Sequence, residues 1–486
     1  MSFSSDSSQV PHVALFPSAG MGHLTPLLRF AALLLRRHHC RLTLITANPT
    51  VSLAESRLIS RFLSSFPAVS HVQFDLLPLD SSTVATDDPF WLQFEATRRS
   101  LADLVAPLLS SLSPPLSALV LDISLITPVG SIADSLSLPC YVLYISTARM
   151  LSLFTYFPKI LASGFSDASL KIPGLVSPIA RSSLPSMMFN PTSLFANIFL
   201  TDAPKLRRLH GVLINTFDGF EADSELEALV TEGKVADGGP YFPPLFSVGP
   251  FPPCKFEFEP DPESNPSAAS AVSKWLDEQP EGSVVYVSFG SRTALPREQM
   301  REVGKGLILS GHKFLWVVKD KKVDKEEEEG NIDEVVGKEL MEKLKEKGLV
   351  VKKWVDQGEI LGHKAVGGFV SHCGPNSLVE SAWHGVKILA WPQHGDQRVA
   401  AEVVRECGLG MWVESWGWLG GDHDPTAAVK GEEIGERIRE MMGSEKLSLK
   451  AASIREKARK ADEVGGSRDK VFERLVHEWK NKKSVN

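Results

Sequence analysis

Several features that define well-known protein classes are missing from this 486-residue sequence. The N-terminus is rich in serine and has no basic segment followed by an apolar one, so no signal peptide is predicted. The apolar runs are too short to span a bilayer. The five cysteines form no CxxC or Cys/His pattern, which argues against structural zinc and indicates reduced thiols in a cytoplasmic protein. A GxSxG elbow and a P-loop are also missing, so hydrolase and nucleotide-kinase functions have no support.

An excess of basic charge is also missing. Lys and Arg number 52 against 59 Asp and Glu, which gives a formal net charge of −7. Because a nucleic-acid partner requires a basic surface, we expect no nucleic acid, and anionic membranes are disfavoured for the same reason. A dense charge run at 319–329, KDKKVDKEEEE, is typical of a solvated surface loop. We expect a monomer whose partners are small molecules.

The sequence does contain two sets of alternating strand and helix patterns, and its length favours two domains over one. Apolar segments typical of buried strands occur in the first half at His12–Phe16, Arg41–Ile45, Leu116–Ile123 and Tyr141–Ile145. The corresponding segments of the second half are Ser283–Phe289, Phe314–Val318, Gly348–Lys352, Gly367–Ser371 and Lys387–Ala390. The first helical pattern runs from about Thr25 to Arg37. Strands that alternate with helices predict a parallel, doubly wound α/β sheet in each half.

A stretch rich in proline and acidic residues, at about 248–270, separates the halves and is typical of a linker. We therefore expect a first domain at 1–254 and a second at 255–460, with a ligand in the cleft between them. The remaining residues, 461–486, are charged and helical in pattern. We expect them to form a helix that packs back on the first domain.

A Gly-x-Gly-His turn, Gly20 to His23, follows the first predicted strand. Glycines there allow a tight turn and close approach of a ligand. The turn fails as a dinucleotide fingerprint, because Thr25 occupies the third glycine position and the second strand ends without an acid for ribose. This disfavours an NAD-type oxidoreductase, the competing interpretation of two Rossmann-like halves. His23 has the chemistry of a general base near neutral pH; a helix-start histidine bonded to backbone is the alternative.

Asp122 is the second candidate, because it lies near the carboxyl end of the strand Leu116–Ile123, and ligands of open α/β sheets bind at such ends. A carboxylate there has the chemistry to orient a histidine and to stabilise its charged form. Capping the following helix is the alternative role. Many residues separate Asp122 from His23, so spacing alone does not bring them together.

The strongest pattern lies between Trp354 and Gln397. A strand, a His372-Cys373-Gly374 turn and a helix that begins near Asn376 and Ser377 place backbone amides and a helix dipole where a diphosphate would bind. His372 has a donor to add to this site. Ser291 ends an earlier Ser-Phe-Gly-Ser turn, which also offers amides and a hydroxyl to phosphate.

Other residues of the same segment have the chemistry to bind the rest of a nucleotide sugar. Glu380, one turn into the helix, suits ribose hydroxyls, and Trp354 offers a flat face to a base. Trp391, Asp396 and Gln397 follow the next strand and suit the hydroxyls of a sugar. Each residue has a structural alternative, a core position for Trp354 or a helix cap for Asp396, but the ordered set favours a nucleotide-sugar site.

The segment from Trp354 to Gln397 resembles the signature box of the plant family 1 UDP-glycosyltransferases. Through Gly-x-Gly-His and Ser-Phe-Gly-Ser, the similarity extends over nearly the whole chain. The resemblance implies the GT-B architecture, in which two Rossmann-like domains face a central cleft. It also implies inversion at the anomeric carbon, no metal and no cofactor, with a UDP-sugar, UDP-glucose above all, as co-substrate. The first domain would bind the acceptor and the second the UDP-sugar.

The resemblance also implies roles for individual residues. His23 would be the catalytic base and Asp122 its partner. The residues that would bind the donor are Gly22, Ser291, Trp354, Val355, Gln357, His372, Gly374, Asn376, Ser377, Glu380, Trp391, Asp396 and Gln397. We expect an acceptor pocket lined by Phe90, Phe94, Ile123, Met150 and Phe154, although phenylalanines at helical spacing are also typical of a core.

Shorter motifs resemble the flavonoid C-glycosyltransferases of this family, which implies β-C-glucosides of flavonoid-type phenols such as a phloretin-like ketone or a 2-hydroxyflavanone. They are Asp88-Pro89-Phe90, the order Asp122-Ile123, Ser-Arg-Thr-Ala at 291–294 and Pro-Gln-His-Gly-Asp-Gln at 392–397. An O-glucosyltransferase of the same fold is the main alternative, and a non-catalytic UDP-sugar sensor is another.

Pro375 departs from the family, which has Trp at this position for holding glucose, whereas Gln397 favours glucose. Asp422-His423-Asp424 matches a metal-binding DxD pattern, but its Gly/Pro-rich surroundings indicate a surface turn.

Overall fold

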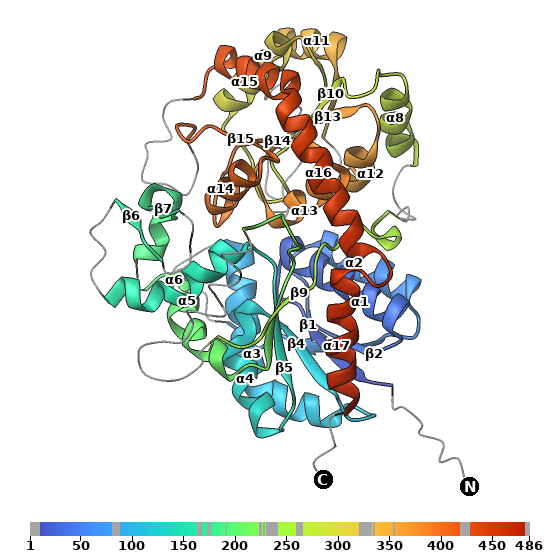
Figure 1. Cartoon of the computed structure of the whole chain (residues 1–486), viewed down its shortest axis with the longest axis vertical. Coiled ribbons are helices and arrows are strands. Elements are labelled where there is room, and N and C mark those ends of the chain that lie inside the picture. The colour runs from blue at the N-terminus through green and yellow to red at the C-terminus, as the bar shows by residue number, and fades with distance from the viewer. Residues whose placement is uncertain are drawn as a thin grey trace.

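The computed structural model describes most of the chain, in the following ranges: 10–79, 88–162, 168–172, 175, 177–190, 192–222, 226, 229, 242–258, 266–319, 333, 336–352, 355–417 and 428–481. Trp354, the turn at Asp422-His423-Asp424 and the charge run beyond Lys319 lie outside these residues. The described elements form two α/β domains, one above the other in Figure 1.

The first domain is built on a parallel sheet with the strand order β3-β2-β1-β4-β5-β8-β9. Its strands are β1 His12–Phe16, β2 Arg41–Asn48, β3 Ser70–Asp75, β4 Ala118–Asp122, β5 Cys140–Tyr144, β8 Gly211–Ile214 and β9 Leu245–Ser247. The central strands β1, β4 and β5 are buried at every residue, because helices cover both faces. Phe16 of β1 pairs with Leu121 of β4, so the turn after β1 emerges beside Asp122.

The second domain repeats this design with the strand order β12-β11-β10-β13-β14-β15, also parallel. Its strands are β10 Val284–Ser288, β11 Lys313–Val317, β12 Leu349–Val351, β13 Val366–Ser371, β14 Lys387–Ala390 and β15 Gly410–Trp412. Ser371 pairs with Ser288 on one side and with Ala390 on the other. The turns after β10, β13 and β14 therefore meet at one edge of the sheet. The predicted doubly wound α/β fold is confirmed.

Helices flank both sheets (Figure 1). Those of the first domain are α1 Met21–His38, α2 Leu53–Ser65, α3 Pro89–Ser111, α4 Ile126–Ser135, α5 Ala148–Ala162 and α6 Leu194–Asp202. Those of the second are α8 Pro266–Asp277, α9 Arg297–Ser310, α11 Lys338–Lys347, α12 Gln357–Gly362, α13 Pro375–His384, α14 Gln397–Cys407 and α15 Gly431–Gly443. α1 begins four residues earlier than its pattern predicts. A short antiparallel ribbon pairs β6 Ser169–Leu170 with β7 Ile179–Ala180.

The chain returns to the first domain at its end. α16 Glu445–Asp462 lies against α13, and α17 Ser467–Asn481 packs against α1 and β9 (Figure 1). Phe472 and Trp479 of α17 are buried in the core cluster on one face of the first sheet. Arg468 donates a 2.6 Å hydrogen bond to the carbonyl of Pro250, just before the second domain begins. None of the helices in the described part of the chain has the length and apolar character needed to cross a membrane.

Candidate active site

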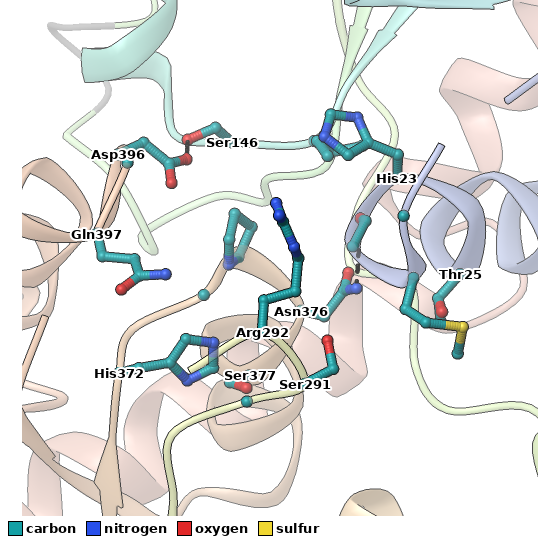
Figure 2. Close-up of a pocket in the computed structure, with 18 of the residues that line it drawn as sticks. His23, Thr25, Ser146, Ser291, Arg292, His372, Asn376, Ser377, Asp396 and Gln397 are labelled. Atoms are coloured by element: carbon teal, nitrogen blue, oxygen red, sulfur yellow. Dashed lines mark hydrogen bonds between the residues drawn. The ribbon is translucent and has the colours of Figure 1, made fainter. Parts of the chain in front are cut away.

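A cavity of about 430 Å³ lies between the two domains and is lined by residues of both. The turns that follow β1, β4 and β5 line it from the first domain, and those that follow β10, β13 and β14 from the second. This is the edge where open α/β sheets bind ligands, and the volume suits a small molecule. Figure 2 shows His23 and Ser146 on one side of the cavity and His372, Ser377 and Ser291 on the other.

The turn before His23 depends on glycine. Gly20 has a φ of 99°, and a Cβ at this residue would lie 2.7 Å from the Phe90 ring. Any other side chain would strain the backbone and displace that ring. Gly22 faces open space in the cavity. The turn thus delivers His23 to the cavity in the first turn of α1.

His23 and Asp122 meet although the sequence separates them widely. His23 Nδ1 lies 2.7 Å from Asp122 Oδ2, and the side chains are 26% and 2% exposed. Asp122 also accepts hydrogen bonds from the amide and hydroxyl of Ser124, at 3.0 and 2.6 Å, and so caps the turn η2 Ile123–Leu125. Asp122 therefore combines the two roles that its position predicts, since it caps the next element and holds a histidine.

The charges of this pair determine which nitrogen of His23 is free. Burial raises the pKa of Asp122, but His23 and Ser124 lower it more, so the carboxyl is ionised. An ionised carboxylate only accepts hydrogen bonds, so His23 Nδ1 carries the proton and Nε2 keeps its lone pair. Burial lowers the pKa of His23, yet Asp122 more than offsets this, and the net effect raises it. This arrangement suits a general base.

His372 lies on the opposite wall, where two glycines leave space for its ring. A Cβ at Gly290 or at Gly374 would each lie 2.5 Å from His372 Nε2. Burial, helped by His394 and Lys319, lowers the pKa of His372 to about 3, so the imidazole is neutral. A neutral imidazole donates one hydrogen bond without bringing a charge.

The N-terminus of α13 also faces the cavity. Gly374 is the N-cap, and Pro375, Asn376 and Ser377 line the wall beside it. Helix N-termini present unpaired amides that bind anions. Pro375 fits without cost at this position, because its missing amide would have no partner within the helix. Asn376 Nδ2 also reaches the carbonyl of Gly22, 3.5 Å away in the other domain (Figure 2).

Gln357 and Glu380 are joined on the same side of the cavity. Gln357 Nε2 donates to Glu380 Oε2 at 2.8 Å and to Ser377 Oγ at 2.9 Å. Glu380 Oε1 accepts from Arg29, a buried residue of α1, at 2.6 Å. Val355 lines the cavity beside Gln357.

Asp396 and Gln397 line the cavity at the start of α14. Asp396 accepts a short hydrogen bond from Ser146 of the first domain (Figure 2). Gln397 Oε1 accepts from the amides of Gln393 and His394, at 2.8 and 3.0 Å, which orients its amide group.

Trp391 does not fit its predicted place among the donor-binding residues. Its side chain is 2% exposed and does not line the cavity. The ring packs instead against Phe289 and Trp416, with centroids 5.5 and 4.4 Å away. As the residue directly after β14, it points into the core of the second domain. Trp391 therefore belongs to the core of the second domain and not to the cavity wall.

One part of the cavity wall, formed by residues of the first domain, is aromatic. All five residues predicted for the acceptor pocket line it, namely Phe90, Phe94, Ile123, Met150 and Phe154. Four more, which the sequence interpretation missed, join them, namely Trp91, Phe195, Ile198 and Phe199. The phenylalanines are largely buried, so both interpretations of their helical spacing hold, as core and as cavity wall. Such a wall suits a flat apolar ring.

Arg292 crosses the cavity from the second domain to this aromatic wall. Its Nη2 donates to Asp88 Oδ1 at 2.8 Å, and its guanidinium lies 3.9 Å from the centroid of the Phe90 ring. Asp88 in turn caps α3 by accepting from the amide of Phe90 at 3.0 Å. The motifs Asp88-Pro89-Phe90 and Ser-Arg-Thr-Ala, far apart in sequence, are therefore in contact.

Comparison with known proteins agrees with this geometry. Residues 254–416 match the family model described as "UDP-glucoronosyl and UDP-glucosyl transferase". UDP-glycosyltransferase 708G2 of Citrus unshiu is 52% identical over 97% of both chains. The chain belongs to the UDP-glycosyltransferase family. UDP-glycosyltransferase CGT of Oryza sativa subsp. japonica is 44% identical over 94% of this chain and 93% of its own. The crystal structure of LpCGTa in complex with UDP is 43% identical, with a TM-score of 0.82 over 97% of this chain and 99% of that chain.

The predicted UDP-glycosyltransferase and its GT-B architecture are thus confirmed. Sequence interpretation missed Arg29 and Ser146 as residues of the UDP-glycosyltransferase cavity. Arg29 had a recognisable signature, because it is the one charged residue in the apolar stretch Leu24–Leu35. Ser146 had none, because a serine after a strand is common. Within the described residues, His, Cys, Asp and Glu side chains nowhere gather in threes that could hold a metal ion.

Proposed function

We propose that this UDP-glycosyltransferase is an inverting C-glucosyltransferase that transfers glucose from UDP-glucose to a ring carbon of a polyhydroxylated phenol. The single observation that carries the proposal is the 2.7 Å contact between His23 and Asp122, placed between the aromatic wall and the N-terminus of α13. A base at this position would have a flat phenol on one side and a nucleotide sugar on the other, within one cavity. We further propose that the enzyme is a cytoplasmic monomer.

The donor would lie along the second domain. The uracil would stack on Trp354 and bond to Val355 and Gln357, and Glu380 would hold the ribose. Neutral His372, Ser291 and the first turn of α13 would bind the diphosphate, because unpaired amides and a neutral imidazole stabilise an anion without a counter-ion. Asp396 and Gln397 would bind the sugar hydroxyls, with Gly22 and Gly374 giving room for close approach.

The reaction would begin when Nε2 of His23 removes a phenolic proton. Asp122 stabilises the imidazolium that results, and the phenolate pushes electron density to the carbon next to it. That carbon forms a bond to C1 of glucose from the face opposite UDP, while the bond between C1 and the diphosphate oxygen breaks and UDP leaves with the electron pair. The attacking carbon then loses its hydrogen as a proton to solvent, and the electron pair of that bond restores the aromatic ring as a phenolate, which takes back the proton held by His23. The product is a β-C-glucoside.

Attack by carbon is favoured over attack by oxygen by two observations. The order Asp122-Ile123 resembles that of the C-glycosyltransferases. Ile123, the residue that follows Asp122 in the sequence, lines the cavity. The chain is also similar over most of its length to proteins named CGT. An O-glucosyltransferase would use the same donor residues, so only the linkage in the product separates the two.

The test is incubation of the purified enzyme with UDP-glucose and phloretin, followed by mass spectrometry before and after hot acid. A glucosylated product that survives acid carries a carbon–carbon bond, which is the expected result. A product that reverts to phloretin is an O-glucoside and refutes the C-linkage. His23→Ala is the control that should abolish either product. If only another UDP-sugar is used, Pro375→Trp tests whether this residue sets the donor.

A further inference from the structure

Arg29 is a buried cation of α1 that connects three parts of the chain. Its side chain is 4% exposed. Nε and Nη2 donate to the two carboxylate oxygens of Glu257, at 2.8 and 2.7 Å, and Nη2 also donates to Glu380 Oε1 at 2.6 Å. Nη1 donates to the carbonyl of Phe251 at 3.3 Å. Glu257 and Phe251 belong to the segment that joins the domains, and Glu380 belongs to α13 of the second domain.

Glu380 is held from two sides by these contacts. Oε1 accepts from Arg29 and Oε2 accepts from Gln357, at 2.6 and 2.8 Å. A carboxylate has about four acceptor positions, so each oxygen keeps one for a further donor. Arg29, Glu257 and Glu380 all line the cavity. The two bonds therefore fix the plane of the carboxylate and leave acceptors for hydroxyl groups of a ligand.

Arg29 also compensates the negative charge of Glu380. Glu380 is buried, and in the proposed function it lies in the same cavity as a diphosphate anion. A buried carboxylate beside an anion is costly unless a cation compensates it. Burial lowers the pKa of Arg29, but Glu257 and Glu380 more than offset this, so the guanidinium stays charged. Among the described cavity residues, Arg29 is the cation in contact with Glu380.

We propose that Arg29 is a positioning residue for ribose recognition, so that the first domain helps to bind the nucleotide of the second. It acts through Glu380, whose carboxylate it orients and neutralises toward the two ribose hydroxyls. The inference rests on the proposed donor site. Discrimination between nucleotides with and without ribose hydroxyls is then not a property of the second domain alone. The bidentate pair with Glu257, a residue of the linker, holds Arg29 in place.

The test compares UDP with 2′,3′-dideoxy-UDP by isothermal titration calorimetry, without acceptor. Wild type should bind UDP about 10- to 160-fold more tightly, since hydrogen bonds to a charged group contribute about 1.5–3 kcal/mol. In Arg29→Met this ratio should fall below about threefold. Arg29→Lys, which keeps the charge but loses the fork, should give an intermediate ratio. Arg36→Met, an exposed arginine of the same helix, is the matched control and should keep the wild-type ratio.

The ligand ratio separates positioning from a purely structural role. If Arg29→Met and Arg29→Lys weaken both nucleotides equally and keep the wild-type ratio, Arg29 only supports the fold and the inference is wrong. If wild type binds UDP without discriminating the dideoxy compound, Glu380 does not hold the ribose, and the proposed donor site fails first. Arg29→Lys retains a buried cation, so the comparison remains possible if Arg29→Met does not fold.

Discussion

Replacement of Asp122 by Asn tests the catalytic pair with almost no change in shape. Asn keeps an oxygen for the amide and hydroxyl of Ser124, so the cap of η2 survives. At the other end an amide NH₂ would replace the carboxylate oxygen that accepts from His23. Nδ1 of His23 would then accept, Nε2 would carry the proton, and the nitrogen that faces the acceptor would no longer be a base.

The size of the effect follows from the contact that is lost. A hydrogen bond to a charged group contributes about 1.5–3 kcal/mol, which corresponds to about a 10- to 160-fold change in rate. The wrong tautomer adds to this loss, so we expect kcat/KM to fall by at least tenfold and up to about 10⁴-fold, the usual upper range of general acid–base catalysis. UDP binding should not change, because Asp122 does not line the cavity.

The assay is the pH profile of kcat/KM for wild type, Asp122→Asn and Asp103→Asn, an exposed carboxylate of α3 that serves as control. Asp122 raises the pKa of His23, so wild-type activity should fall as the pH drops through that raised value. Without the carboxylate, the remaining activity should hold to lower pH. Activity within threefold of wild type with an unchanged profile would refute the role of Asp122.

Three further predictions use other features. Gly20→Ala places a Cβ 2.7 Å from the Phe90 ring at a φ of 99°, so thermal unfolding should show a loss of about 1–3 kcal/mol, and an unchanged melting temperature would contradict the strain. Burial and the nearby carboxylates raise the pKa of Asp356 to about 7, so the folded protein loses stability as the pH rises through this value. Asp356→Asn should therefore raise the melting temperature at pH 8 more than at pH 5. An equal rise in melting temperature at both pH values would exclude ionisation of Asp356 as the cause. EDTA should leave turnover unchanged, because neutral His372 and α13 are proposed to bind the diphosphate, and dependence on added Mg²⁺ would oppose that assignment.

Sequence patterns predicted the elements that carry strong local information. β1, β4, β5 and β10 are buried along their whole length, so their apolar runs are unbroken. The missed strands β3, β8, β9 and β15 are either half exposed or only three to four residues long. In such segments the register is set by the neighbouring strand, which the sequence does not reveal.

The residues of the site also divide into those that local sequence marks and those that only tertiary contacts place. Residues next to glycine turns and strand ends, such as His23 and His372, could be found because local backbone rules mark these places. Trp391 was misplaced because an aromatic residue after a strand can face either the cavity or the core, and packing against Trp416 decides it. Contacts between domains, such as Arg292 with Asp88, depend on tertiary structure and have no signature in sequence spacing.

The return of α17 to the first domain has a mechanical consequence. The polypeptide passes between the domains twice, once at 248–258 and once between α16 and α17, and Arg468 ties the second passage to Pro250 of the first. Two adjacent covalent passages act as one hinge, so opening of the cleft is expected to be a rotation about a line through them. For protein engineering, the first domain is therefore discontinuous in sequence, and an exchange of the second domain has to end before α17. A chimera that keeps the first domain intact must also keep residues 467–481 from the same parent, since Phe472 and Trp479 belong to that domain's core.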